Sequence, residues 1–342
     1  MALSKNNNFN LIRILAATGV LFSHSFALTS GDSYQEPFRR FPGLSLGHMC
    51  VDVFFFSSGY LVLTSLLRRS MLAFIKSRAA RIIPGLWVNL LIVALVACAW
   101  QSQLPLGSYY RTQELRNYFL WNGTIVFKSF DQLPQVFVNN PFHLVNGSLW
   151  TLRYELRMYF VLFFIGLAGF IFKRCRTEFI LFSCIGLSLV GFIIASWQVN
   201  HAVDGLPGNF ARFSFFFFAG GFWAQHGPVP RHWHPILFLI AVLAAIWSTS
   251  VFYMVYSVSI CFLIPYLAFV PKGRIREFNR CWDVSYGVYI YAFPIQQMLI
   301  SMNLHLRPLQ VFFLVGIVLV PVASLSWILV ERPILKWVRT GA

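Results

Sequence analysis

Arg13 and His24 are the two residues of this sequence whose types and spacing most directly suggest chemistry. Both lie in the first long apolar run, Phe9 to Leu28, where an arginine at a helix centre costs about 2.5–3.5 kcal/mol on insertion scales. Eleven positions apart, at about 100° per residue, the two side chains share one helix face and lie about 16 Å apart along the axis. Such a helix carries a permanent cation near one end and a titratable imidazole near the other. Either residue alone is equally consistent with a snorkelling arginine or with a histidine packed among aromatic rings.

The composition defines the class of protein that must position these residues. The 342 residues are 58% hydrophobic and only 11% charged, whereas a soluble domain is about a quarter charged. This composition predicts an integral membrane protein, and the 37 Phe and 11 Trp fit rings that face lipid or anchor at its interfaces. A net charge of +16 suggests a nucleic-acid partner. The basic residues, however, cluster in short loops between apolar runs, which argues against one.

Ten apolar runs are long enough to cross a bilayer. They cover residues 9–28, 46–67, 83–103, 147–172, 178–197, 209–225, 235–251, 252–271, 284–302 and 308–330. With the N-terminus inside, the inner segments hold 17 of the 27 Lys and Arg residues and the outer loops hold 6. Cytoplasmic loops carry such an excess, so we predict that both termini are cytoplasmic. The polar segment 104–146 is too short for a separate domain. We therefore expect one all-α membrane domain over residues 1–342, with about ten transmembrane helices.

Two carboxylates are also predicted to lie inside the membrane. Asp52 is near the outer end of the second span, ahead of the small residues Ser58 and Gly59. Glu155 lies about two turns into the fourth span, at a depth resembling that of His24. A buried carboxylate holds an imidazole in one tautomer and raises its basicity, so either acid is a candidate partner for His24.

Each of these candidates has a structural alternative. The pair Ser58-Gly59 either lets a thin ligand thread past the helix or simply allows two helices to pack closely. For Glu155 the alternative is an ion pair with one of three arginines, Arg153, Arg157 or Arg212.

Arg78 and Arg81 stand just before the third span, at the predicted cytoplasmic boundary. Three positions apart, they share a helix face, and guanidinium groups chelate phosphate oxygens in a forked geometry. The pair therefore suits a phosphate-bearing ligand or, alternatively, a positive-inside anchor. Glu331, after the last span, is interpreted as structural and bound to a cytoplasmic arginine.

A metal site is not expected. The eight histidines include no i, i+4 helical pair, and no C-x-x-C spacing occurs among the six cysteines, Cys50, Cys98, Cys175, Cys184, Cys261 and Cys281. Cys175 and Cys281 fall on the predicted cytoplasmic side and are interpreted as reduced and structural.

In their order along the chain, the motifs resemble those of the acyltransferase family 3 membrane proteins. The motifs are Arg13 with His24, Phe54-Phe55-x-x-Ser58-Gly59, Arg78-x-x-Arg81-Ile-x-Pro84, Ser148-Leu-Trp-x-Leu-x-x-Glu155, Asp283-Val-Ser285-Tyr286-Gly-Val-Tyr289-Ile-Tyr291 and Glu331-x-Pro333. The sequence departs from many members at Ala292, where they carry a histidine. The resemblance implies transfer of acetyl or another short acyl group to hydroxyls of envelope glycans such as O-antigen or exopolysaccharide. It also implies a multi-pass protein of the bacterial inner membrane.

The resemblance and the residues together suggest a mechanism. Acetyl-CoA, the expected donor substrate, docks from the cytoplasm with its phosphates at Arg78 and Arg81, and its pantetheine arm passes Arg13 and the small residue Ser58. His24 acts as general base on a hydroxyl of a glycan or lipid-linked glycan, and a transient acetyl-His24 is the variant. Membrane lipids and acyl-CoA are the other expected partners.

Two other classes of function remain open from the sequence. A proton-coupled secondary transporter or flippase would also carry intramembrane Arg, His, Asp and Glu. A non-catalytic scaffold for polysaccharide synthesis would leave His24 dispensable.

Overall fold

In the computed structural model the chain is helical, and its described residues contain no strand. These residues are 7–41, 43–125, 128–171, 177–198, 206–227, 233–244, 248–280, 282–302 and 305–340. They pack into two compact units. The first comprises Met1–Ala16, Phe38–Met71 and Arg157–Cys281, and the second Ala17–Pro37, Leu72–Leu156 and Trp282–Ala342. A single domain over 1–342 stays a prediction.

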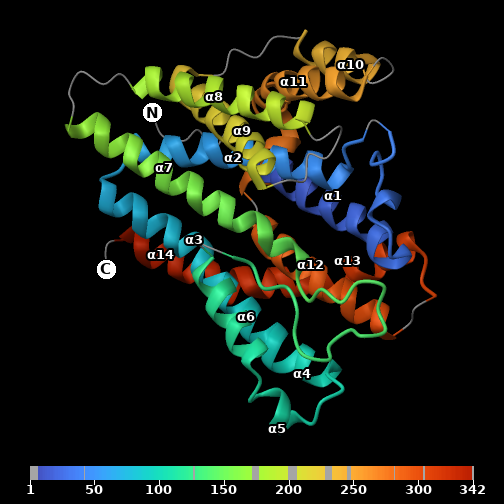
Figure 1. The fold of residues 1–342 in the computed structure, drawn as a ribbon. Helices are drawn as coiled ribbons and strands as arrows, with labels where there is room; N and C mark the ends of the chain where they lie inside the picture. Colours follow the sequence, from blue (N-terminus) through green and yellow to red (C-terminus); the bar gives the residue numbers. More distant parts are fainter. Residues whose placement is uncertain are drawn as a thin grey trace. The chain divides into compact units, whose positions relative to one another are not determined.

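The first unit is built on apolar helices that pack in pairs. Its helices are the start of α1 (Phe9–Ser30), α2 (Leu46–Leu66), most of α7 (Leu152–Ile171), α8 (Thr177–Gln198), α9 (Leu206–His226), α10 (His234–Ala244) and α11 (Thr249–Phe269). α9 packs against both α2 and α8, and α10 packs against α11 (Figure 1). A Cβ at Gly59 of α2 would overlap the Phe217 carbonyl of α9, and one at Gly220 of α9 would overlap the Phe56 carbonyl. Small residues thus let the two backbones touch.

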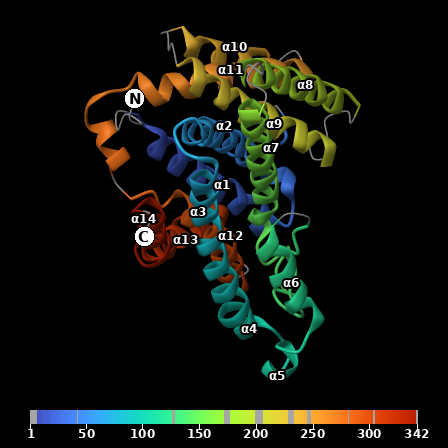
Figure 2. The same ribbon diagram turned by 90° about the vertical axis from the view of Figure 1, so that its left-hand side faces the viewer.

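The second unit holds the remaining helices. They are the end of α1, α3 (Met71–Leu91), α4 (Cys98–Gln101), α5 (Leu106–Tyr109), α6 (Gln113–Thr124), the first turn of α7, α12 (Ser285–Met302), α13 (Pro308–Ser326) and α14 (Arg332–Thr340). A π-helical turn, Ile92–Ala97, joins α3 to α4, and another, Trp327–Glu331, joins α13 to α14. α12 and α13 pack side by side, and α4, α5 and α6 cluster at one end of this unit (Figure 2).

A proline inside α12 explains how the chain preceding α7 is anchored. Pro294 has no N–H to donate to the Ile290 carbonyl one turn earlier. The Asn89 and Asn146 side-chain amides donate to that carbonyl instead, at 3.1 and 2.9 Å. Asn146 also accepts from the Ser148 N–H at 3.2 Å and so caps the 3-10 turn Gly147–Thr151. The freed carbonyl therefore fixes the approach to the first turn of α7.

Hydropathy located all ten predicted helices, whereas the number of membrane crossings stays a prediction. Five helical stretches of the described chain are long and apolar enough to cross a membrane, Phe9–Ser30, Leu46–Leu66, Met71–Gln101, Thr249–Phe269 and Pro308–Val338. The run expected at 235–251 is shorter than predicted, because α10 ends at Ala244 and Ser248 caps α11. The fourth expected helix begins as the 3-10 turn at Gly147 and becomes α-helical only at Leu152.

Candidate active site

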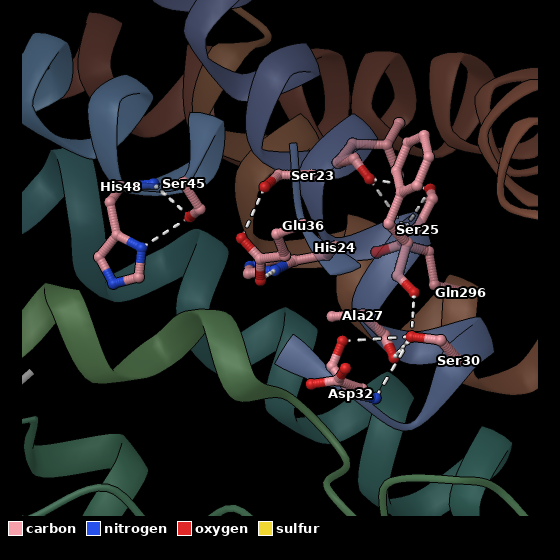
Figure 3. A network of polar contacts seen from close by, with 12 residues as sticks. Ser23, His24, Ser25, Ala27, Ser30, Asp32, Glu36, Ser45, His48 and Gln296 are labelled. Carbon is pink, nitrogen blue, oxygen red and sulfur yellow. Dashed lines mark hydrogen bonds and ion pairs between the residues drawn. The ribbon is translucent and has the colours of Figure 1, made fainter. Parts of the chain in front are cut away.

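His24 lies near the end of α1 and faces a carboxylate from the loop that follows. Its Nδ1 is 3.5 Å from Oε1 of Glu36, and the Ser23 hydroxyl donates to Oε2 of Glu36 at 2.6 Å (Figure 3). The Glu36 side chain is only 9% exposed and that of His24 is 24% exposed. Glu36 follows directly after the 3-10 turn Ser33–Gln35, which Asp32 caps, so a short ordered turn returns this acid to the helix.

α12 packs against the same stretch of α1. The Gln296 amide donates to the Leu21 carbonyl at 2.9 Å and to the Ser25 hydroxyl at 2.8 Å (Figure 3). The Phe293 ring lies edge-on to the His24 ring, with centroids 5.6 Å apart. One side of the imidazole therefore meets an aromatic ring while Nδ1 faces Glu36.

Glu155, predicted as an orienting acid, lies in the first turn of α7 within the second unit. It is half-buried, and its charge acts on the hydroxyls of Tyr286 and Tyr289 of α12. Tyr289 itself donates to the Ser148 carbonyl at 3.0 Å and contacts the Thr151 hydroxyl at 2.6 Å. Glu155 is thus near enough to Tyr286 and Tyr289 to act on them electrostatically, whereas the acid beside His24 is Glu36.

Asp52, the other predicted orienting acid, forms a buried ion pair in the first unit. Oδ1 accepts from Nε of Arg212 at 2.8 Å and Oδ2 accepts from its Nη2 at 2.9 Å. The Tyr256 hydroxyl donates to Oδ2 at 3.1 Å, and Arg212 also donates to the His48 carbonyl. Both charged side chains are almost fully buried, so this pair ties α2, α9 and α11 together. Arg212 is thereby engaged by Asp52 rather than by Glu155.

Arg13 and Ser58 also belong to the first unit. Arg13 is half-buried on α1, and Ser58 is buried on α2 beside the Gly59 contact with α9. That contact supports the helix-packing interpretation of Ser58-Gly59. An acyl-CoA role for Arg13 and Ser58 stays a prediction.

Arg81 is held by two carboxylates of the second unit. Its Nη2 donates to Oδ2 of Asp283 at 2.7 Å, and its Nη1 is 3.6 Å from Oε2 of Glu331. The guanidinium also lies over the rings of Tyr286 and Trp327. Glu331 is thus paired with an arginine as expected, and the cytoplasmic side of that arginine stays a prediction.

Arg78 differs from Arg81 in its environment. It is half-buried on α3, and its Nε makes a long contact of 3.5 Å with the Ser77 hydroxyl. Two acids contact Arg81, and a phosphate-binding role for Arg78 and Arg81 stays a prediction.

Within the described ranges, no group of three or more His, Cys, Asp or Glu is placed to hold a metal ion. Cys50, Cys98, Cys184 and Cys261 are free thiols. Cys175 and Cys281, predicted to be reduced and structural, lie outside the described residues.

The chain is thus a helical protein with a histidine–carboxylate pair, an arrangement that enzymes use for general acid–base catalysis. Residues 6–329 match the profile of the acyltransferase 3 family, described as an acyltransferase domain. The chain belongs to this family and is an acyltransferase.

Two curated relatives match nearly the whole chain. An O-acetyl transferase of Shigella phage Sf6 is 30% identical, covering 96% of this chain and 96% of the relative. Nodulation protein 10 of Rhizobium leguminosarum bv. viciae is 24% identical, covering 96% of this chain and 93% of the relative. No solved structure matches the chain.

Proposed function

We propose that this acyltransferase moves an acetyl or other short acyl group from cytoplasmic acyl-CoA to a hydroxyl of a cell-envelope polysaccharide, across the bacterial inner membrane. The family match and the relative named O-acetyl transferase support acyl transfer to oxygen. The apolar helices support a membrane location. The single observation that carries the chemistry is the pairing of His24 with Glu36, 3.5 Å apart.

His24 acts as the general base. Glu36 holds the imidazole with its proton on Nδ1, which directs Nε2 to the acceptor hydroxyl. As the hydroxyl oxygen attacks the thioester carbonyl, its proton passes to Nε2. The carbon–sulfur bond then breaks, and the departing CoA thiolate takes up this proton from Nε2 of His24. Glu36 stays ionised throughout and stabilises the transient imidazolium, while Ser23 fixes the second carboxylate oxygen.

In this proposal Arg78 binds a CoA phosphate, and Arg13 and Ser58 contact the pantetheine arm. Arg13 and His24 are about 16 Å apart along α1. The excess of Lys and Arg on the inner side supports a cytoplasmic donor. Arg81 serves mainly to hold Asp283 and Glu331.

Substitutions on α1 and its loop test this mechanism in purified protein with acetyl-CoA and no ion gradient. We expect His24→Ala to abolish acyl transfer with folding near wild type. Glu36→Gln should lower kcat by about 10²–10⁴-fold, the range for misplaced acid–base groups, with donor KM little changed. Glu114→Gln, at an exposed acid of α6, is the matched control and should retain activity. Strong acylation by His24→Ala would refute the mechanism, and transport without transfer would instead identify a carrier.

Sidedness is tested separately in right-side-out vesicles. Acetyl-CoA loaded inside should acylate external glycan, whereas acetyl-CoA added outside should give no product. Equal activity from both sides would overturn the direction of transfer and leave the role of His24 intact.

A further inference from the structure

A small hollow in the second unit contains two cations that the proposed mechanism does not use. It measures about 210 Å³ when the space open to solvent is included. α6, the loop after it and the start of α7 contribute most of its lining. Leu86, Leu149 and Leu152 form an apolar side, and Trp121, Lys128, Ser129 and Arg153 bring aromatic and polar groups. Some of this volume is open to solvent, so the enclosed part accepts at most one small group and not a whole sugar.

The lining of this hollow includes two cationic side chains, Lys128 and Arg153, and, in the described part of the chain, no acidic one. The Nε of Arg153 is buried and has no hydrogen-bond partner among the described residues. The acid that acts on Arg153 is Asp131, and burial raises the pKa of its carboxyl despite the opposing effect of Arg153. Lys128 is exposed at the rim and adds a second positive charge. The lining thus brings two cations, Arg153 with its buried Nε and Lys128, against the one nearby acid Asp131, which favours an anion.

A short series of contacts joins this hollow to His24. The Phe293 ring packs against the imidazole, with centroids 5.6 Å apart. The same ring covers Gly147, where an added Cβ would lie 2.8 Å from it. Gly147 opens the 3-10 turn that continues into Leu149 and Leu152 of the lining. Phe293 therefore lies between the general base and the turn that leads to the hollow.

We infer that this hollow binds an anionic group, a carboxylate or a phosphate, carried by the acceptor saccharide. Its binding would place a neighbouring hydroxyl toward His24 and make the enzyme select acidic glycans. The inference rests on the proposed function for its biological meaning, although anion binding itself can be measured without acyl transfer.

The binding test uses the full chain purified in detergent, titrated with glucuronate, glucose 1-phosphate, inorganic phosphate and neutral glucose. Wild type should bind the anions more tightly than glucose, and the first two arms distinguish a carboxylate from a phosphate. Arg153→Gln and Lys128→Gln should each weaken anion binding by about tenfold, the effect of losing one charge-assisted contact. Arg116→Gln is the matched control, because Arg116 is an exposed cation of α6 outside the lining.

Acyl transfer is then measured on oligosaccharides with and without an acidic residue. Lys128→Gln, at the exposed rim, should raise KM about tenfold for the acidic acceptor only. Equal binding of glucose and glucuronate, or equal losses in Arg116→Gln, would overturn the inference. Absence of transfer by wild type together with selective anion binding would instead reject the proposed function and retain the anion site.

Discussion

Replacing Asn146 with alanine tests how the turn before α7 is held. Asn146 is fully buried, donates to the Ile290 carbonyl at 2.9 Å and accepts from the Ser148 N–H at 3.2 Å. Each net hydrogen bond contributes about 1 kcal/mol, and a buried donor left unsatisfied costs about 1–3 kcal/mol. We therefore expect Asn146→Ala to lower the free energy of unfolding by about 2–4 kcal/mol. Titration with denaturing detergent in mixed micelles measures this change.

A second substitution, Pro294→Ala, tests whether Asn146 compensates for the N–H that proline lacks. Pro294→Ala restores an N–H that can donate to the Ile290 carbonyl, so the Asn146 donor then becomes redundant. In that background Asn146→Ala should cost about 1 kcal/mol less, while the cost of the lost Ser148 cap remains. Asn122→Ala is the matched control, because Asn122 is buried in the same unit but bonds only to Phe130.

The comparison of Asn146→Ala with and without Pro294→Ala has a clear refuting result. If Asn146→Ala costs the same with proline and with alanine at position 294, the freed carbonyl does not anchor the turn. If Asn122→Ala shows the same relief, Pro294→Ala has loosened the whole unit and the local explanation fails.

Further predictions concern helix contact and charge. Gly59→Ala should prevent stable folding, judged by the yield of monodisperse protein, because its Cβ would overlap the Phe217 carbonyl, whereas Gly316→Ala, with open space around it, should be tolerated. Arg78→Ala should raise the KM for acetyl-CoA at nearly unchanged kcat, and an unchanged donor KM would assign it to anchoring alone. Arg81→Ala should instead lower the free energy of unfolding by about 3–5 kcal/mol, because it removes the guanidinium that contacts both Asp283 and the buried Glu331. Loss of donor affinity without loss of stability would contradict that assignment.

Sequence periodicity located the long helices well because each must be apolar along most of its length. Sequence periodicity missed α6 within the expected outer loop, because polar and apolar residues alternate irregularly along this helix and only a few of them pack. Phe119, for example, stacks against Trp87. Periodicity also placed the start of α3 late. The chain is already helical from Met71, twelve residues before the predicted run begins at residue 83, and this polar first part carries Arg78 and Arg81.

The site was harder to predict than the helices, because pairing between distant residues leaves no local pattern. Asp52 and Arg212 are 160 positions apart, and nothing in either segment indicates the other. Glu36 was missed although a signal existed. The chain has only 11 acidic residues, and Asp32 and Glu36 are the first two after His24. Glu36 lies in the short loop after α1, and because acidic residues are rare in this chain, this proximity in sequence to His24 indicates a pairing.

The pairing of His24 with Glu36 has a consequence for how this enzyme can diverge. Base, carboxylate and the supporting serine all come from one continuous stretch, Ser23 to Glu36, inside the segment Ala17–Pro37 of the second unit. Because these residues are contiguous in sequence, a single exchange of this segment can transfer all of them together. Chimeras between relatives that exchange this stretch whole should keep the His24–Glu36 contact intact, while crossovers between residues 24 and 36 separate the imidazole from its acid. Other segments can then be exchanged without disturbing the proposed catalytic pair.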